Sequence, residues 1–469
     1  MPATLDECFG RMRAAASGHP HPSHAWRKRR LDALEQVVRQ HVEDFCTAIG
    51  SDFGGRSSHE TRLLEVLPTL EAIRFARQHL QVWMAPEPRK TSRWFMTASA
   101  SVHHEPLGVV GIVVPWNYPL YLACAPLVGA LAAGNRVMLK LSELAPETGR
   151  LMQRLLSDAF RDDEVRAFVG DACVGRAFAR LPFDHLLFTG SAAVGREILK
   201  AAAETLTPVT LELGGKSPAI VAEGYPVGHA AARIVLGKCL NAGQTCIAPD
   251  YALVPESAVE SFVGDASRAA QELYPEPLTS PDYTAIISGR HYDRLMRWLD
   301  EGKEAGARVV PLMPGIEPEP QSRRIPPVAV IGAPDHCALM RVVIFGPILP
   351  VVAYRSLDEA IGYVARRPRP LALYYFDHEP ARIERVLKET KAGGVTINDV
   401  LFHVAQEDLP FGGVGPSGMG RYHGREGFVT FSNAKAVFHQ SRWAPAALLK
   451  PPYTGRLDRL VRYLTSAGR

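Results

Sequence analysis

A cysteine in the segment "NAGQTCIAPD" (241–250) is the first candidate for chemistry. A thiol acts as a nucleophile when nearby donors favour its thiolate and a substrate can reach it. The commoner fate of a lone cysteine is to be a small buried residue. We assign Cys239, which lies on a helical pattern seven residues before Cys246, to packing. Cys246 is therefore a candidate nucleophile that needs partner groups.

Two polar residues could be those partners. Glu212 lies in "TLELGGKSP" between Leu211 and Leu213, and its carboxylate is either solvated or desolvated with a raised pKa suited to general-base work. Asn117 lies in "VPWNYP", directly after an apolar run, and is either a turn residue or a functional amide. A cysteine hydrolase would need a histidine base instead, for which His403 in "LFHVA" is a candidate.

A glycine turn at 190–195 could bind a phosphate. The run "DHLLFTG" (184–190) leads into Gly190, Ser191 and Gly195 in the pattern G-S-x-x-x-G, just before a predicted helix. Backbone amides at such a turn can bind an anion, although many turns of this kind bind nothing. In "KLSE", Lys140 and Glu143 could hold the ribose hydroxyls of a nucleotide. Together these features favour a dinucleotide site.

The elements that must position these groups alternate between short β-rich runs and helical stretches. In the first half we predict strands at 108–114, 136–140, 165–169, 184–190 and 208–213, with helices at 119–133, 147–160, 172–180 and 192–204. In the second half we predict helices at about 227–240, 256–273 and 289–304, and strands at 217–222, 250–255 and around 328, 350, 371 and 395. This alternation predicts two α/β domains with parallel sheets.

Other segments are less regular. Apolar spacing from Trp26 to Ile49 predicts one amphipathic helix. The proline-rich run 311–327 is expected to be a surface loop, and the glycine-rich run 411–428 to be either an ordered loop with special dihedral angles or a flexible one.

Composition limits the functional classes. The chain has 469 residues, a net charge of +4 and seven scattered cysteines without CxxC spacing, so we expect reduced thiols, no zinc or other metal site and a cytoplasmic location. The start "MPATLDECFGRMR" resembles no export signal, and the longest apolar region is interrupted by prolines, so no membrane span is expected. The run "RKRR" (27–30) is a weak signal for nucleic-acid binding, and a solvated helix face is favoured.

Eight segments resemble, in order and spacing, the aldehyde dehydrogenase superfamily. They are "PWNYP", "KLSE", "FTGS", "LELGGKSP", "NAGQTCIAPDY", "IFGPILP", "GGVTIND" and "LPFGGVGPSGMGRYHG". The match covers almost the whole chain. Within the superfamily, "GMGRYHG" and "PPYTG" (451–455) are similar to the class 3 branch, and "AIGSDFGGRSSHET" with "LQVWMAPEPRK" is most similar to bacterial members that act on coniferyl aldehyde.

This resemblance implies a reaction and a role for each candidate. Cys246 matches the nucleophile that attacks an aldehyde, Asn117 and the Cys246 amide match the oxyanion hole, and Glu212 matches the base that activates water. The coenzyme is expected to be NAD or NADP. Residues matching cofactor contacts are Trp116, Lys140, Glu143, Gly190, Ser191, Gly195, Leu213 and Phe345. Residues matching the substrate tunnel are Tyr118, Tyr121, Phe402, His403 and Phe411, whose rings suit an aromatic or long apolar aldehyde.

Two departures from the family pattern affect the prediction. Leu141 replaces the usual proline of "KPSE" and removes no catalytic group. In "MRVVIFGP", Val342 and Val343 stand where the family has two glutamates, and the second of these normally accepts hydrogen bonds from the nicotinamide ribose. Valine cannot accept them, which leaves open a weakly active enzyme, a non-redox thioester or ester hydrolase, or a non-enzymatic cofactor-binding protein.

The resemblance also implies a domain plan and a homodimer. We expect an aldehyde dehydrogenase-like α/β fold of two Rossmann-like parallel-sheet domains and a small β arm for oligomerisation. The expected parts are a cofactor-binding domain (1–90 and 106–213), a catalytic domain (214–410), the arm (91–105 and 430–445) and a C-terminal tail (446–469). Dimer contacts are expected from arm strands near 95–105 and 433–441.

Overall fold

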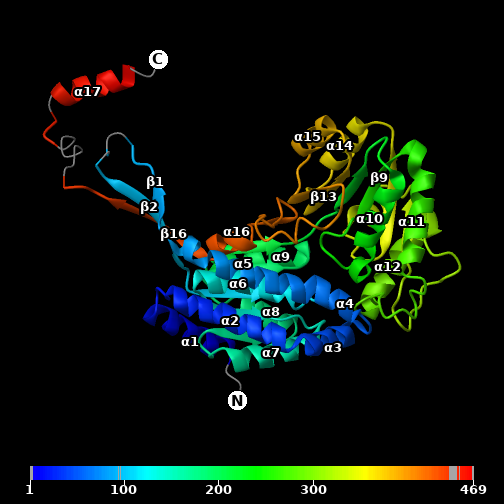
Figure 1. The fold of residues 1–469 in the computed structure, drawn as a ribbon, viewed down its shortest axis with the longest axis horizontal. Coiled ribbons are helices and arrows are strands. Elements are labelled where there is room, and N and C mark those ends of the chain that lie inside the picture. The colour runs from blue at the N-terminus through cyan, green and yellow to red at the C-terminus, as the bar shows by residue number, and fades with distance from the viewer. Residues whose placement is uncertain (1–3, 93–94, 96, 443–450, 454, 467–469) are drawn as a thin grey trace.

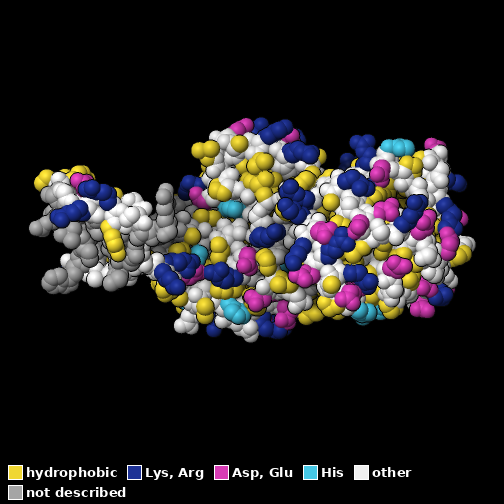
Figure 2. Space-filling view, turned by 90° about the horizontal axis from the view of Figure 1, so that it is seen from above, with side chains coloured by type: hydrophobic (Ala, Val, Ile, Leu, Met, Phe, Trp, Pro, Cys, Tyr) yellow, Lys and Arg dark blue, Asp and Glu magenta, His cyan; other side chains and the backbone are white. Residues whose placement is uncertain are grey.

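A computed structural model describes residues 4–92, 95, 97–442, 451–453 and 455–466. It contains two α/β lobes and a narrow projection (Figure 1). Residues 446–450, 454 and 467–469 of the predicted tail, and 93–94, 96 and 443–445 of the predicted arm, lie outside the described residues. Among the described helices, none is long and apolar enough to cross a membrane. Lysines and arginines alternate with acidic residues over the face shown in Figure 2.

The first lobe is built around a six-stranded sheet of order β15-β7-β6-β3-β4-β5. Its strands are β3 (Val109–Val113), β4 (Arg136–Lys140), β5 (Val165–Phe168), β6 (His185–Thr189), β7 (Val209–Glu212) and β15 (Gly418–Met419). Its helices are α1 (Leu5–Gly18), α2 (His24–Gln40), α3 (Val42–Phe53), α4 (Ser58–Thr61), the π-helical η1 (Arg62–Val66), α5 (Leu67–Met84), α6 (Tyr121–Ala133), α7 (Pro146–Ala159), α8 (Ala172–Ala179), α9 (Ala192–Glu204) and α16 (Gly424–Thr430).

The second lobe holds a seven-stranded sheet of order β10-β11-β12-β9-β8-β13-β14. Its strands are β8 (Pro218–Val221), β9 (Tyr251–Pro255), β10 (Arg308–Pro311), β11 (Val328–Ile331), β12 (Ile348–Tyr354), β13 (Ala372–Phe376) and β14 (Gly394–Ile397). Its helices are α10 (Val227–Cys239), η3 (Leu240–Gly243), η4 (Glu256–Ala258), α11 (Val259–Leu273), α12 (Gly289–Glu304), α13 (Ala338–Arg341), α14 (Leu357–Ala365) and α15 (Pro380–Glu389).

The projection is a three-stranded antiparallel sheet of order β1-β2-β16, followed by a helix. Its elements are β1 (Glu87–Arg89), β2 (Ser99–Pro106), β16 (Ser432–His439) and α17 (Gly455–Ser466). β2 pairs with β16 from Pro106 opposite Ser432 to Ser99 opposite His439. Strands therefore lie in both segments expected to form the arm, and β1 adds a third that the sequence did not indicate.

The longest apolar region of the chain is core. All thirteen residues of α6 are buried, and the helix packs against α2, α5 and α16 as well as the sheet. A helix that is apolar on every side needs such cover, because no face of it can meet water favourably. This explains why the first lobe has so many helices on one face.

The predicted helix from Trp26 to Ile49 is two helices. α2 ends at Gln40, and α3 begins after His41, whose φ of −120° and ψ of 27° are not helical. The ring of His41 contacts Asp44 at 2.7 Å across the break. The apolar spacing continues through both helices, because both pack on the same core, so the spacing alone could not reveal the break.

The parallel sheets each carry one antiparallel edge strand that the prediction of parallel sheets did not include. β10 pairs antiparallel with β11 across the proline-rich run, and β15 pairs antiparallel with β7. β15 belongs to the glycine-rich run, which is ordered. At Gly418 (φ +148°) a Cβ would stand 2.2 Å from the Leu211 oxygen, so only glycine allows this approach. The chain thus returns to the first lobe beside Glu212, which pairs with Gly418.

Candidate active site

The loop that carries Cys246 is held in an uncommon backbone conformation. η3 follows α10, and within it Asn241 and Ala242 have φ values of 52° and 50°. The side chain of Gln244 fixes this loop, because its Nε2 donates to Ala285 O at 3.1 Å and its Oε1 accepts from Ile287 N at 2.9 Å. Non-glycine residues in the left-handed region persist only where their surroundings enforce them, and they are frequent at functional sites.

Asn117 joins this loop to the first lobe. Its Nδ2 donates to Gln244 O at 3.1 Å, and its own main-chain oxygen accepts from Asn241 Nδ2 at 3.0 Å. The residue is 3% exposed. One hydrogen of the Asn117 side-chain amide is thus bonded to the main-chain oxygen of Gln244, two residues before Cys246. The second hydrogen remains available to an oxygen bound nearby.

A buried ionic cluster supports this junction, and the sequence analysis missed it. Arg56 Nη1 donates to Glu65 Oε1 at 2.7 Å and to Asn117 O at 3.3 Å. Glu65 Oε2 accepts from the amides of Leu120 and Tyr121, at the start of α6, at 2.8 and 3.1 Å. Both side chains are fully buried. Removing one partner of such a pair leaves an uncompensated buried charge, which costs about 3–5 kcal/mol.

Glu60 completes the cluster from the same segment. Its Oε1 accepts from Asn241 N at 2.5 Å and its Oε2 from Thr284 Oγ1 at 2.7 Å. The cluster therefore reaches the second lobe directly. The signal in the sequence was four charged residues within the stretch 56–65, of which Arg56, Glu60 and Glu65 are buried. Charged residues are usually solvated, and nothing in the local pattern showed that these three are buried.

Glu212 and Cys246 lie close together at the junction. Glu212 is 2% exposed, and neither carboxylate oxygen has a hydrogen-bond partner. Burial raises its pKa to about 8, and the charge of Arg421 opposes this in part. Burial and then the negative charge of Glu212 raise the pKa of the Cys246 thiol to about 12. A Cβ on Gly214, just after β7, would stand 4.0 Å from that of Cys246. The resting site therefore favours both groups in their protonated forms at neutral pH.

Aromatic side chains surround the thiol. The Tyr118 hydroxyl lies 2.6 Å from Thr245 Oγ1, and the Tyr121 hydroxyl lies 3.3 Å from Nε2 of His423, a buried histidine that the sequence analysis did not select. The rings of Phe411 and His423 stack at 5.1 Å between centroids, and the His403 ring lies 6.2 Å from that of Phe411.

Phe402 stands apart from this aromatic cluster. It is 51% exposed and its ring faces the guanidinium of Arg233 at 5.6 Å. Two further rings contribute instead. The Tyr374 hydroxyl donates to Ile247 O, and Tyr422 lies 5.8 Å from Phe411.

The glycine turn has the features of a phosphate site. Ser191 caps α9, with its hydroxyl accepting from Val194 N at 3.4 Å, and it is exposed at the carboxyl end of β6. A Cβ on Gly195 would stand 2.6 Å from Leu213 Cδ2, so glycine lets the start of α9 approach the end of β7. Gly190 N donates to Glu212 O at 2.9 Å, which ties the turn to the carboxylate strand. The first amides of a helix lack partners within it and can bind an anion.

Lys140 and Glu143 lie at the carboxyl end of the neighbouring strand β4. Lys140 Nζ donates to Leu141 O at 2.8 Å and to Glu143 Oε2 at 3.3 Å, although Lys140 itself is only 4% exposed. This pair presents both a donor and acceptors, which is what ribose hydroxyls require. These residues fit a dinucleotide.

The other predicted cofactor contacts belong to the junction between the lobes. Trp116 and Phe345 meet edge to face at 5.4 Å. Val342 is 47% exposed, and its main-chain oxygen accepts from Lys216 at 3.3 Å. Val343, the next residue in the chain, is partly exposed, and its side chain offers no hydrogen-bond acceptor. Within the described residues, no cluster of His, Cys, Asp or Glu could hold a metal ion.

The two-lobed α/β fold thus brings a thiol, a buried carboxylate and a glycine turn together at one junction. Comparison with known proteins gives the family. The aldehyde dehydrogenase family model matches residues 2–437, and the chain belongs to this family. The chain is therefore an NAD(P)-dependent aldehyde dehydrogenase, as its sequence predicted, and its fold agrees with that assignment.

Individual relatives cover nearly the full length. The chain is 51% identical over 457 residues to a probable coniferyl aldehyde dehydrogenase of Pseudomonas aeruginosa, covering 97% of this chain and 95% of the relative. It is 44% identical over 440 residues to a coniferyl aldehyde dehydrogenase of Pseudomonas sp., covering 93% and 91%. A substrate-bound Staphylococcus aureus AldH structure matches at a TM-score of 0.93 with 36% identity, covering 98% of this chain and all of that one.

The raised pKa of Glu212 predicts a pH-dependent change in stability. Below pH 4.5 the carboxyl is protonated whether the chain is folded or unfolded, so its contribution is fully present. Between pH 4.5 and about 8 only the unfolded chain ionises at this carboxyl, so stability falls as pH rises, by about 5 kcal/mol in total. We expect the melting temperature of Glu212→Gln to exceed that of the parent by a margin that grows up to about pH 8 and then levels.

Differential scanning fluorimetry from pH 5 to 9 measures that margin. Glu304→Gln, an exposed position at the end of α12, is the matched control and should follow the parent at every pH. A margin that does not change with pH would show that the Glu212 carboxyl ionises equally well in the folded and unfolded chain.

Proposed function

We propose that this aldehyde dehydrogenase oxidises an aromatic or long apolar aldehyde, with coniferyl aldehyde to ferulate as the specific candidate. The observation that carries the proposal is the placing of Cys246, Glu212 and Asn117 at one junction, surrounded by aromatic rings. The names of the relatives at 51% and 44% identity support the choice of substrate. Flat apolar faces suit an aryl group better than a short polar aldehyde.

The residues then have separate tasks. The Cys246 thiol loses its proton to water, and the sulfur attacks the carbonyl carbon and forms a C–S bond while the C=O π electrons move to the oxygen, which becomes an alkoxide. The free hydrogen of the Asn117 amide and the Cys246 N–H stabilise that oxygen, at about 2.7–4 kcal/mol for one such donor. A bound NAD or NADP would supply a hydride acceptor, and departure of the hydride would let the alkoxide re-form the C=O bond, which leaves a thioester on Cys246.

Glu212 serves the second half of the reaction. As a carboxylate it takes a proton from water, whose oxygen attacks the thioester carbon, and the C–S bond breaks to release the carboxylic acid and the thiol. Its pKa of about 8, raised from 4.5, makes the Glu212 carboxylate a stronger base than a free carboxylate. Residues proposed to hold the dinucleotide are Trp116, Lys140, Glu143, Gly190, Ser191, Gly195, Leu213 and Phe345. An indole-3-acetaldehyde dehydrogenase structure in complex with NAD+, 25% identical with a TM-score of 0.84 over 93% of this chain and 88% of its own, supports that binding mode.

A second candidate function rests on Val343. If the nicotinamide end is poorly held, Cys246 and Glu212 could still hydrolyse an ester or thioester without redox chemistry. Such an enzyme would release acyl groups in the absence of oxidised cofactor.

The predicted cytoplasmic location stays a prediction.

The substrate proposal is tested with a panel of aldehydes. Reduction of NAD or NADP is followed at 340 nm with coniferyl aldehyde, a long-chain aldehyde and acetaldehyde, and we expect kcat/KM to be highest for coniferyl aldehyde. Cys246→Ser should lose more than about 10³-fold of the activity because the nucleophile is gone. Cys173→Ser, which changes an exposed thiol outside the junction, should keep the activity of the parent. Highest kcat/KM for acetaldehyde would refute the substrate, and full activity of Cys246→Ser would refute the mechanism.

The effect of Val343 is tested by single-turnover formation of NADH. Val343→Glu restores an acceptor worth about 1–3 kcal/mol of positioning, so the rate should rise by about 10–100-fold. Val342→Glu adds the same charge at the exposed neighbouring position and should leave the rate within about twofold. Equal rates for the parent and Val343→Glu would refute the argument.

We also propose a homodimer formed through the projection. β16 is an edge strand with mostly exposed side chains, including Phe438 at 52%, and unpaired strand edges tend to pair with another chain. Sedimentation velocity at micromolar concentration should give about twice the chain mass of 51.3 kDa. A single species at the mass of one chain would contradict the proposal.

A further inference from the structure

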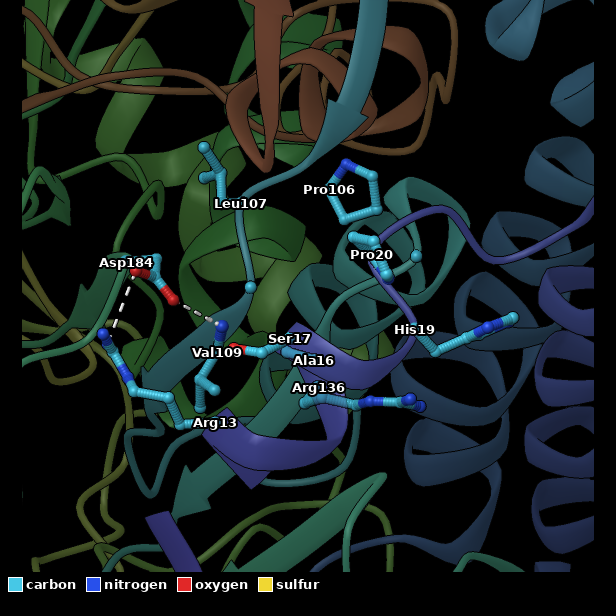
Figure 3. Close-up of a pocket in the computed structure, with 12 residues that line it drawn as sticks. Arg13, Ala16, Ser17, His19, Pro20, Pro106, Leu107, Val109, Arg136 and Asp184 are labelled. Atoms are coloured by element: carbon cyan, nitrogen blue, oxygen red, sulfur yellow. Dashed lines mark hydrogen bonds and ion pairs between the residues drawn. The ribbon is translucent and has the colours of Figure 1, made fainter. Parts of the chain in front are cut away.

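Two neighbouring cavities lie at the amino ends of the strands of the first sheet, away from the active site. The smaller, of about 240 Å³, forms where the end of α1 meets the first residues of β3 and β4 (Figure 3). The larger, of about 430 Å³, is lined by α2 and by the turn before β5. His19 and Arg136 line both cavities, and their side chains extend in the same direction in Figure 3.

The lining is rich in guanidinium groups. It includes five arginines and three carboxylates, namely Arg13, Arg29, Arg30, Arg136, Arg161, Asp163, Glu164 and Asp184. Each carboxylate already has a cationic partner. Asp184 accepts from Arg13 and from Val109 N (Figure 3), Asp163 binds Arg161 through two bonds of 3.0 Å, and Glu164 pairs with Arg30. Arg29 and Arg136 are left without a carboxylate within 4.0 Å among the described residues.

Arg136 is the unusual member. It is 6% exposed, and among the described residues its Nη1 has no hydrogen-bond partner and its Nη2 has only Ala15 O at 3.5 Å. Its guanidinium lies 4.8 Å from the centre of the Trp26 ring, and that of Arg30 lies 3.9 Å from the same centre. Burying a cation without an anionic partner is costly, so the site as it stands is incomplete.

Titration supports the same conclusion. Burial lowers the pKa of Arg136, with Arg161 adding to this effect and Asp163 opposing it. Burial also lowers the pKa of Arg30 to about 10, and its Nε has no partner. A bound anion would offset the burial cost of both guanidinium groups.

We propose that these cavities bind a small phosphate-bearing anion, with Arg136 as the buried donor and Arg29 and His19 at the rim. Guanidinium groups bind phosphate oxygens in forked pairs, and a tetrahedral group offers oxygens to several donors at once. A planar carboxylate offers two oxygens on one side only. Free phosphate and a phosphate monoester share this chemistry.

This site is separate from the dinucleotide turn. Arg136 is the first residue of β4 and Lys140 is the last. The strand therefore rises by four residue steps, or roughly 13 Å, between the cavity and the proposed ribose site. Ser191 likewise lies at the carboxyl end of its strand. An anion at Arg136 would tie α1 and α2 to the amino edge of the sheet and stabilise the N-terminal helices.

Isothermal titration calorimetry on the full chain tests the proposal with inorganic phosphate and phenyl phosphate at constant ionic strength. Saturating NAD+ is present, so the cofactor site is not available to the probe. We expect one binding site per chain for at least one of the two probes. The probe that binds more tightly shows whether the site prefers free phosphate or a phosphate monoester. Benzoate, a carboxylate of similar size, should bind at least about tenfold more weakly than phenyl phosphate.

Variants locate the site. Arg136→Met should weaken binding by at least about tenfold, and the double change His19→Gln with Arg29→Gln gives the same test through rim residues if Arg136→Met does not fold. Arg180→Met, an exposed arginine after α8, is the matched control and should bind as the parent does. The proposal would be overturned if saturating NAD+ abolished phosphate binding or if benzoate bound as tightly as phenyl phosphate. Unchanged phosphate binding by Arg136→Met and by the His19→Gln, Arg29→Gln double variant would also overturn it.

Discussion

The structure depends on the contacts that Asn117 makes across the junction between the lobes. Its amide holds the Gln244 carbonyl, and its own carbonyl receives Asn241 and Arg56. Because the Cys246 loop contains two left-handed residues, its shape would relax without these contacts. The buried Arg56–Glu65 pair anchors the same point to the start of α6. The site is thus positioned by hydrogen bonds between segments far apart in sequence, and the two sheets supply the rigid frame.

Burial at this junction controls the chemistry of both reactive groups. The carboxyl of Glu212 and the thiol of Cys246 share a poorly solvated region, so burial disfavours the charged form of both groups, and the charge of Glu212 further disfavours the Cys246 thiolate. A thiolate forms more easily if a positive charge enters the site, such as that of an oxidised nicotinamide ring, or if its proton is removed as the C–S bond forms. The same burial keeps Glu212 basic enough to deprotonate water. Low solvation therefore restrains the thiol at rest and strengthens the base.

The sequence predicted the regular elements and the chemistry, but not the contacts that hold them together. β3, β4, β6 and α9 lie where apolar runs and their spacing placed them, because those patterns follow from burial on a sheet. The burial of Arg56 could not be predicted, since charged residues are usually exposed and only the three-dimensional contacts compensate this one. The antiparallel strand β15 was missed for a related reason. Two residues of a glycine-rich run carry no periodicity, and their pairing partner lies about two hundred residues earlier.

The backbone around Val343 does not depend on the side chain at that position. Lys216 donates to Leu339 O at 2.6 Å and to Val342 O at 3.3 Å, and Asp250, its ion-pair partner, accepts from Ile344 N at 3.0 Å. These bonds fix the main chain on both sides of Val343 and hold Phe345 in contact with Trp116. A change from an acidic residue to valine therefore removes one acceptor without moving the segment. The effect we propose for valine is therefore on how firmly a ribose is held there, and not on the positions of Cys246, Glu212 or the aromatic rings.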